Sequence, residues 1–348
     1  NAFFTAQDGR LIQPDSMPYP YVIKTLMPNY REFDDTRHFF SLQKLARELG
    51  TTPDQLISPV TLKVRGQRYQ AGCLLCEDGW SDNYEMEPLA MLQHASIDFF
   101  VNSSASPYTL GKNDKRNRVF GQQARDAKAP LFYVNAIGLQ NNGKTIYTFD
   151  GSSTAYNANG EVCATAAEYQ EGLTIIDLET TDTLPAATPE AEPDIAHIYR
   201  ALHYGIRHFL ANIHMQKVVI GISGGIDSAV AAALYAKVIG PENLLLVNMP
   251  SVFNSETTKG LSQQLAENLG CQYMIVPIQQ SVDHTVEQLE HTPMTHLADG
   301  TTCQLNISSF VTENIQARDR SARVLAGAAP PLGGGSPCNA NKAETTAG

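Results

Sequence analysis

The amino-acid sequence predicts an α/β protein with two domains. Its 348 residues are enough for about two domains of ordinary size. The stretch from Glu179 to Pro193 consists mainly of Thr, Ala, Pro and acidic residues without periodic apolar positions, which is typical of a linker. After it, short apolar runs alternate with helical patterns, which favours a parallel, doubly wound sheet. We therefore expect domains at 1–177 and 194–348, joined by residues 178–193.

The composition limits the classes of partner and the cellular compartment that we expect for the protein. Hydrophobic residues make up 43% and charged residues 18%, so both halves can bury a core. Lys and Arg total 25 against 36 acidic residues, and the net charge of −11 argues against a nucleic-acid partner. Apolar runs are too short to cross a membrane, no signal peptide is recognised, and six cysteines are too few for a disulfide framework. We expect a cytoplasmic protein without membrane or nucleic-acid partners.

The first half reads as strands with one early helix. An Asp-Gly turn predicts a hairpin within residues 1–12. Phe39, Leu42, Leu45 and Leu49 recur at helical spacing and predict a helix over 36–49 that ends at Gly50. The expected strands cover residues 71–75, 97–102 and 131–135, followed by a meander through residues 148–153 and an Asn-Gly turn.

The strand 71–75 ends at Cys76, a thiol followed by two acidic residues and then by Trp80, the only tryptophan. Reactive side chains are often displayed where strands end, and a thiolate is a competent nucleophile when a nearby Lys ammonium lowers its pKa. Cys73 lies inside the apolar run and is expected to be a small buried residue. For Cys76 taken alone, a structural thiol remains the alternative.

The second half alternates strands and helices. A helix is expected to begin at Asp194, which could cap it, with an apolar stripe formed by Ile195, Ile198, Leu202, Ile206 and Leu210. Residues 291–304 are expected to form a polar loop, and no strand is expected within 330–337. The further expected strands are 217–220, 244–249 and 273–276, and the further helices are 229–236, 255–269 and 313–326, the last ending at Gly327.

A glycine-rich loop lies between the strand 217–220 and the helix that follows it. It comprises Gly221, Ile222, Ser223, Gly224, Gly225, Ile226, Asp227 and Ser228. Small residues let the backbone approach a ligand, and the helix N-terminus adds unpaired N–H groups and positive potential. This combination predicts a phosphate site, although the Gly-x-x-x-x-Gly-Lys-Ser/Thr motif is absent. An ordinary glycine-rich turn is the alternative.

The string Ser-Gly-Gly-Ile-Asp-Ser (223–228) resembles the pyrophosphate loop of the ATP-pyrophosphatase superfamily. The resemblance implies that ATP is split into AMP and pyrophosphate while a substrate is adenylated. It also implies that the serines and glycines hold the pyrophosphate and that Asp227 helps to hold Mg²⁺. ATP and Mg²⁺ are therefore the expected cofactors.

The first half resembles the nitrilase (carbon–nitrogen hydrolase) superfamily in its order of strand–Cys, strand–Asn-x-Ser and strand–Asn. This resemblance implies part of a nitrilase-like α-β-β-α sandwich. More narrowly, the strings Lys24–Tyr30 and Cys76–Trp80 resemble motifs of glutamine-dependent NAD synthetases. The family implies that Lys24 is the lysine of a Glu-Lys-Cys triad and that Cys76 forms a glutamyl thioester. By the same resemblance, glutamine is held by Tyr30, Glu77, Ser106 and Lys112.

Two strings of the second half also resemble this family. In Glu313–Arg320, the resemblance implies that Asn314 and Arg318 contact deamido-NAD, and a solvated charged helix face is the alternative. In Asn339–Glu344, Asn339 stands at the position of a Thr that contacts ATP. Glu344 keeps the carboxylate that contacts deamido-NAD and shares the metal with Asp227, as suits Mg²⁺.

The order of the two halves implies ATP- and glutamine-dependent amidation of deamido-NAD to NAD through an adenylated intermediate, by an enzyme expected to be a homo-oligomer. Two alternatives remain: another adenylating amidotransferase or tRNA-thiolating enzyme, or a catalytically incomplete nucleotide-binding fragment. The family places its triad Glu before the lysine, and none of the 23 residues before Lys24 is Glu. Since family segments are also expected beyond Gly348, the sequence predicts a chain shortened at both ends, with little glutaminase turnover.

Overall fold

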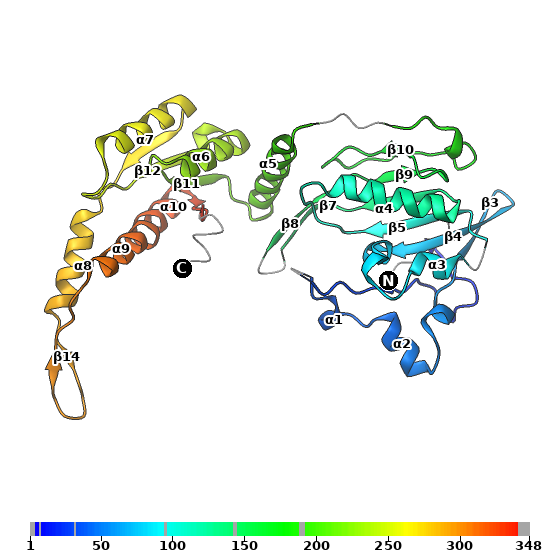
Figure 1. Ribbon diagram of the computed structural model, residues 1–348. Helices are drawn as coiled ribbons and strands as arrows, with labels where there is room; N and C mark the ends of the chain where they lie inside the picture. Colours follow the sequence, from blue (N-terminus) through cyan, green and yellow to red (C-terminus); the bar gives the residue numbers. More distant parts are fainter. Residues whose placement is uncertain are drawn as a thin grey trace. The chain divides into compact units, whose positions relative to one another are not determined.

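The computed structural model describes residues 4–6, 8–30, 33–93, 96–141, 145–187 and 192–339 (Figure 1). Contacts within the chain form two compact units, a first unit from Asn1 to Tyr204 and a second from Gly205 to Gly348. The division lies inside helix α5 (Asp194–Asn212). The domain limits at 177 and 194 therefore stay a prediction, and each unit is described by itself.

The first unit is built on a six-stranded sheet of order β10-β9-β6-β5-β4-β3. Its strands are β3 (Val60–Val64), β4 (Gln67–Leu75), β5 (Phe99–Ser104), β6 (Leu131–Asn135), β9 (Thr154–Tyr156) and β10 (Val162–Thr165). β4, β5 and β6 are parallel, and the outer strands pair antiparallel. Since parallel neighbours need a crossover, β5 and β6 are joined through helix α4 (Lys112–Ala127). The carboxyl ends of β4, β5 and β6 therefore meet at one edge.

Shorter elements surround this sheet. They are the hairpin β1 (Phe4–Thr5)–β2 (Leu11–Ile12), the hairpin β7 (Ile137–Asn141)–β8 (Ile146–Asp150), helices α1 (Asp35–His38), α2 (Leu42–Leu49) and α3 (Pro88–Leu92), and 3₁₀ turns at Pro53–Leu56, Cys76–Gly79, Ser81–Asn83 and Thr181–Thr183. The expected first hairpin and the three central strands are confirmed. α4 packs on the sheet through Phe120, which is fully buried against Tyr133 and Tyr156.

The single helix expected over 36–49 is wrong, because the chain forms α1 and α2 with a break between them. Ser41 lies at the break, and its side chain accepts a hydrogen bond from the Lys44 N–H, which starts a new helix. Phe39 lies at the break and Leu49 at the end of α2, and each is 60% exposed, whereas Leu42 is fully buried. The expected end at Gly50 is confirmed, since its φ of +65° forms a left-handed cap.

The second unit contains a four-stranded sheet of order β13-β12-β11-β16, in which all neighbours are parallel. Its elements are β11 (Lys217–Gly221), α6 (Ile226–Ile239), a 3₁₀ turn (Pro241–Asn243), β12 (Leu244–Asn248), α7 (Glu256–Leu269), β13 (Gln272–Ile275), α8 (Gln279–His291), the hairpin β14 (Met294–Thr295)–β15 (Thr302–Cys303), α9 (Ser309–Arg318), a π-helical segment (Asp319–Leu325), α10 (Ala326–Leu332) and β16 (Gly334–Gly335). Successive residues of β11 point into two cores: Val218 and Ile220 into one, Val219 into the other. Both faces of the sheet are thus covered, which confirms the doubly wound arrangement.

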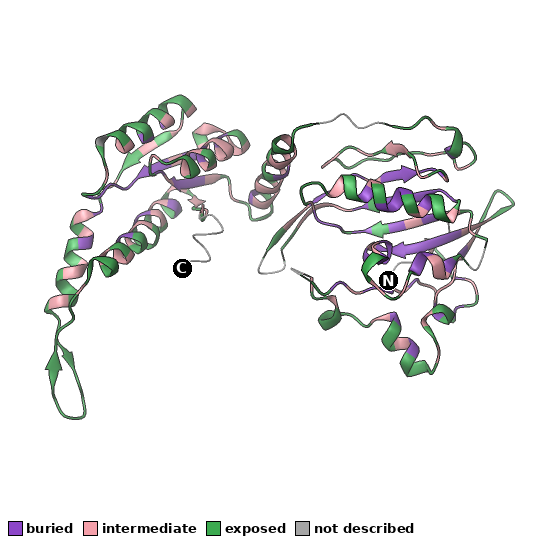
Figure 2. Ribbon diagram, in the orientation of Figure 1, coloured by how far each residue is buried: buried purple, intermediate pink, exposed green. Residues whose placement is uncertain are grey.

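Burial follows this layered arrangement within each unit. Figure 2 shows buried residues concentrated on the central strands, while the helices are mostly exposed or intermediate. The hairpin β14–β15 is exposed throughout. Of the described helices, none is long and apolar enough to cross a membrane. On α5 the expected apolar stripe is buried only in part, because Ile195 is 68% and Leu202 49% exposed while Leu210 is buried.

Three expectations for the second unit are wrong. Residues 291–304 contain the hairpin β14–β15 rather than only a loop, and α8 has no counterpart among the expected elements. The helix expected to end at Gly327 continues through α10 to Leu332, because buried packing of Ala329 outweighs the poor helix propensities of glycine and proline. A strand also forms within 330–337, where Gly334 pairs with Lys217 of β11. A Cβ at Gly334 would lie 2.2 Å from the Lys217 carbonyl oxygen, so glycine allows a pairing that strand propensity does not predict.

A buried carboxylate ties the segment that carries Lys24 to the end of β4. Asp78 Oδ1 accepts hydrogen bonds from the backbone N–H groups of Thr25 (3.0 Å) and Leu26 (2.7 Å), and Oδ2 accepts one from Leu75 (3.1 Å). Burial raises the pKa of Asp78 to about 7, against the opposing influence of these N–H groups and of Lys24. Because the pKa of Asp78 is higher in the folded than in the unfolded chain, protonation of Asp78 stabilises the fold. This stabilisation is complete below the unfolded pKa of about 4 and is lost as the pH rises through about 7.

We expect Asp78→Ala to lower the free energy of unfolding by about 3 kcal/mol or more, because three buried N–H groups lose their acceptor. Urea unfolding followed by the fluorescence of Trp80, the only tryptophan, measures this in the first unit. Asp82→Ala removes an exposed carboxylate four residues away and is expected to change stability by no more than about 0.5 kcal/mol. Equal effects of the two substitutions would contradict the structural role of Asp78.

Candidate active site

Cys76 lies directly after β4, at the edge where the parallel strands end. Its φ of +51° places it in the left-handed region, which non-glycine residues seldom adopt and which often marks functional positions. It lines a cavity of about 1210 Å³. This cavity also brings together the other residues that the sequence assigns to glutamine hydrolysis, namely Lys24, Tyr30, Glu77, Ser106 and Lys112. Their individual roles remain predictions.

The acidity of the Cys76 thiol is set by opposing influences. Burial raises its pKa, the Lys24 ammonium, the Ala105 backbone N–H and the Lys112 ammonium lower it, and Glu77 raises it further. Lys24 thus acts in the expected direction, but burial outweighs it and the net pKa is raised. The group is therefore a thiol at neutral pH, and nucleophilic attack requires a base that takes its proton.

Lys24 has a partner that the sequence analysis missed. Its ammonium lies 2.5 Å from Oδ2 of Asp35, the first residue of α1, and both side chains are mostly buried. In the sequence, Asp35 follows Phe33 and Asp34, shortly after Pro28. A carboxylate at this position is the signal that could have identified the partner of Lys24. The ion pair fixes the ammonium within the cavity that Cys76 lines.

Glu77 is a buried acidic group in the wall of this cavity. Only 6% of it is exposed, and its carboxylate accepts hydrogen bonds from the hydroxyls of Tyr30 (3.2 and 3.3 Å) and Tyr84 (2.8 Å). Burial and this carboxylate raise the pKa of Tyr84, so its hydroxyl stays a donor. Tyr84 was not expected at the site. A buried carboxylate held in this way is suited to bind the ammonium group of an amino acid.

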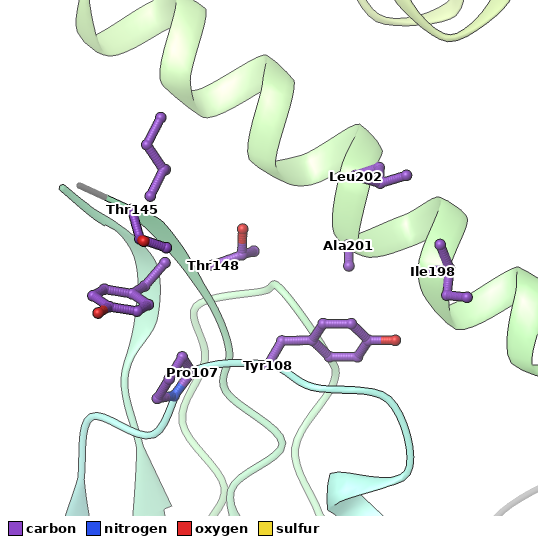
Figure 3. Close-up of a pocket in the computed structure, with 9 residues that line it drawn as sticks. Pro107, Tyr108, Thr145, Thr148, Ile198, Ala201 and Leu202 are labelled. Atoms are coloured by element: carbon purple, nitrogen blue, oxygen red, sulfur yellow. The ribbon is translucent and has the colours of Figure 1, made fainter. Parts of the chain in front are cut away.

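The loop after β5 also lines this cavity. Ser106 is 3% exposed, and the Lys112 ammonium donates to the carbonyl of Pro107 (2.9 Å). A second cavity of about 380 Å³ shares Pro107 and Tyr147 with the first (Figure 3). It is mostly apolar, and its lining is Pro107, Tyr108, Thr145, Ile146, Tyr147, Thr148, Ile198, Ala201 and Leu202. Figure 3 shows the ring of Tyr108 beneath Ile198 and Ala201 of α5.

The glycine-rich loop connects β11 to α6, as expected. The Ser223 N–H donates to the Ser228 hydroxyl oxygen (3.3 Å), the Gly225 N–H donates to the Ser223 hydroxyl oxygen (3.2 Å), and the Ser228 hydroxyl donates to the Gly225 carbonyl (3.1 Å). Gly224 has a φ of +85°, and a Cβ there would lie 2.4 Å from the Thr258 carbonyl of α7. The first turn of α6 contributes N–H groups without intrahelical partners, so the loop has the chemistry of a phosphate site.

The structure describes one of the two expected metal ligands. Asp227 lies in the first turn of α6 with its side chain exposed, and Glu344 lies outside the described residues. Within the described ranges, no group of three His, Cys, Asp or Glu residues could hold a metal ion. One exposed carboxylate beside a phosphate loop nevertheless fits Mg²⁺, which commonly takes one or two carboxylates together with phosphate oxygens and water.

Two of the three residues expected to contact deamido-NAD, Asn314 and Arg318, lie on α9. Arg318 donates to the side-chain oxygen of Asn314 (2.9 Å), one turn earlier. Asn339, which is expected to contact ATP, is the last residue that the structure describes. Arg320 was not expected: it is half-buried, and its Nε donates to the Met249 carbonyl (3.4 Å) just beyond β12. It therefore lies near the carboxyl ends of the strands, where parallel sheets bind ligands.

Comparisons of the sequence point to one family. The NAD synthase family matches residues 198–329. A glutamine-dependent NAD(+) synthetase from Synechocystis sp. is 32% identical over 267 residues, which cover 73% of this chain and 44% of the relative. Another, from Thermotoga maritima, is 29% identical over 338 residues, which cover 87% of this chain and 53% of the relative. The chain thus spans about half the length of these curated relatives.

Solved structures show the same relationship. The glutamine-dependent NAD+ synthetase from Acinetobacter baumannii in complex with ADP matches with a TM-score of 0.74 at 26% identity, over 99% of this chain and 60% of that one. The enzyme from Cytophaga hutchinsonii shares the fold with a TM-score of 0.67 at 15% identity, over 92% of this chain and 57% of that one. These likenesses confirm the expected fold class. By sequence and by fold, the chain belongs to the glutamine-dependent NAD(+) synthetase family.

Proposed function

We propose that this chain carries out ATP- and glutamine-dependent amidation of deamido-NAD to NAD. The observation that carries the proposal is that one chain combines two sites. A thiol and a lysine share a cavity in the first unit, and a phosphate-type loop joins a strand to a helix in the second. The relatives are named for glutamine dependence and NAD synthesis, and the chain spans about half of their length.

The first site is proposed to release ammonia from glutamine. Sγ of Cys76 attacks the side-chain carbonyl carbon and forms a thioester as the C–N bond breaks. A base takes the thiol proton and passes it to the leaving nitrogen, which departs as ammonia. Water then hydrolyses the thioester to glutamate. Lys24 stabilises the negative charge near the sulfur, while Glu77 and Lys112 suit the ammonium and the carboxylate of glutamine, with Tyr30 and Ser106 completing the pocket.

The second site is proposed to activate the nicotinate carboxylate of deamido-NAD. Residues 221–228 and Asn339 hold ATP, while Asn314, Arg318 and Glu344 contact deamido-NAD. Asp227 and Glu344 would hold Mg²⁺, which would neutralise phosphate charge. The carboxylate oxygen attacks the α-phosphorus of ATP and releases pyrophosphate, and ammonia then displaces AMP to give NAD. The relative from Acinetobacter baumannii is in complex with ADP, which supports the binding of an adenine nucleotide by this chain.

Self-association into a homo-oligomer, a cytoplasmic location and the lack of a nucleic-acid partner belong to the same proposal. Six free cysteines are consistent with a reducing compartment. The net charge of −11 argues against binding to a phosphate backbone, and hence against the alternative of tRNA thiolation.

Cys76→Ala is expected to abolish NAD formation from glutamine and to leave formation from ammonium chloride nearly unchanged, because the two chemistries use different sites. The measurement is the initial rate of NAD formation with each nitrogen source. Cys73→Ala removes a buried neighbouring thiol and is the matched control, expected to keep both rates. If ammonium does not restore NAD formation in Cys76→Ala, Cys76 has a structural role.

Alkylation of Cys76 by iodoacetamide is expected to accelerate with pH through a midpoint above that of an ordinary thiol, since burial raises its pKa and the thiolate is the reactive form. Lys24→Met is expected to move the midpoint higher, because the charge that favours the thiolate is lost. Peptide mass mapping identifies the labelled residue. Burial raises the pKa of Cys73 to about 12, so Cys73 should stay unlabelled near neutral pH. An alkylation midpoint that is the same in Lys24→Met and in wild type would contradict the interaction between Lys24 and Cys76.

Asp227→Ala is expected to weaken ATP binding about tenfold or more when Mg²⁺ is present, because the metal loses a charged ligand. Calorimetric titration of ATP with Mg²⁺, and again with EDTA, measures the effect. Asp283→Ala removes an exposed carboxylate of α8 in the same unit and should leave both titrations unchanged. Equal affinities of wild type and Asp227→Ala in Mg²⁺ would overturn the assignment.

A further inference from the structure

The loop after β5 lines the cavity together with Cys76. Ala105 and Ser106 both belong to this lining, and the Ala105 backbone N–H lowers the pKa of the Cys76 thiol. A backbone N–H near a sulfur stabilises the thiolate only while the backbone stays oriented. What fixes the backbone at Ala105 and Ser106 therefore bears directly on the reactivity of the thiol.

The side chain of Asn135, at the end of β6, holds both backbone groups of Ser106. Its Oδ1 accepts from the Ser106 N–H (2.8 Å), and its Nδ2 donates to the Ser106 carbonyl (3.2 Å). That carbonyl also accepts a hydrogen bond from Nη2 of Arg116 on α4 (3.2 Å). The backbone on both sides of Ser106 is thus held by side chains from β6 and α4.

Arg116 is itself fixed by Asp150 at the end of β8. The two side chains form a two-pronged ion pair, with Nη1–Oδ2 at 2.8 Å and Nη2–Oδ1 at 3.0 Å, and they are 2% and 1% exposed. Nδ2 of Asn135 also lies 3.3 Å from Oδ1 of Asp150, so all three side chains form one cluster. None of the three lines the Cys76 cavity.

The burial of this pair needs a reason other than stability. Removing two charges from water is costly, and apolar residues of similar size stabilise a core as well or better. The planar guanidinium, however, bonds a carboxylate and a carbonyl in fixed directions, which Lys or an apolar residue cannot do. The geometry of the ion pair therefore suits it to orient the groups that it bonds.

We propose that the buried Arg116–Asp150 pair, acting with Asn135, positions the backbone at Ala105 and Ser106 in the wall of the cavity that Cys76 lines. Arg116, Asp150 and Asn135 are positioning residues, since they act through this backbone and do not line the cavity. The proposal rests on the proposed function in taking Cys76 as the nucleophile.

The test uses the pH dependence of Cys76 alkylation in wild type, Arg116→Lys and Asn135→Ala. Arg116→Lys keeps the charge but cannot bond Asp150 and Ser106 in two fixed directions, and Asn135→Ala keeps the buried ion pair, so its fold does not depend on an unpaired charge. Both variants should move the alkylation midpoint to higher pH and slow alkylation about tenfold near neutral pH, because a less firmly held Ala105 N–H stabilises the thiolate less. With glutamine, KM should rise, while the ammonia-dependent rate stays unchanged.

Arg125→Lys is the matched control, because Arg125 lies on the same helix, is exposed, and bonds Asn159 and Gln122. It should leave the midpoint and both rates unchanged. A midpoint equal to wild type in both folded variants, with only lower unfolding free energy, would overturn the proposal. Alkylation does not depend on NAD synthesis, so a shifted midpoint without any glutamine-dependent NAD formation would reject the proposed function and keep the positioning role.

Discussion

The site in the first unit depends on three hydrogen bonds to one buried carboxylate. Asp78 accepts the N–H groups of Thr25 and Leu26, more than 50 residues earlier in the chain, and that of Leu75 at the end of its own strand. These bonds bring Lys24 beside Cys76, and Asp35 then fixes the ammonium by an ion pair. The interaction between lysine and thiol is therefore a product of backbone docking, and the reacting side chains themselves contribute little to holding the two segments together.

Parallel pairing supplies the other half of the arrangement. Leu75 is paired with Ser103, and Ser104 with Asn135, so β4, β5 and β6 end side by side. The three residues just beyond or at these ends, Cys76, Ala105 and Asn135, are neighbours for this reason. A shift of register by one residue would turn alternate side chains to the other face, so the register and the site are specified together.

The sequence predicted what local rules control. Periodic apolar residues located the central strands and most helices, and the spacing of glycines located the loop between β11 and α6. It did not predict Asp35 beside Lys24 or Tyr84 beside Glu77, because these contacts depend on how separate segments dock. The raised pKa of Cys76 was also beyond reach, since burial opposes Lys24 and only the folded structure shows which is larger. The break between α1 and α2 was missed because a Ser41 cap competes with helical periodicity.

The pairing of β16 with β11 has a consequence for solubility. β16 occupies one edge of an apolar strand whose Val218, Val219 and Ile220 are almost fully buried. Since a Cβ at Gly334 would collide with the Lys217 carbonyl, a side chain there would push β16 away and leave that edge of β11 unpaired. Open apolar edges are templates on which other chains add strands. Substitution of Gly334 would thus cause aggregation during expression, without a direct effect on the chemistry of the thiol.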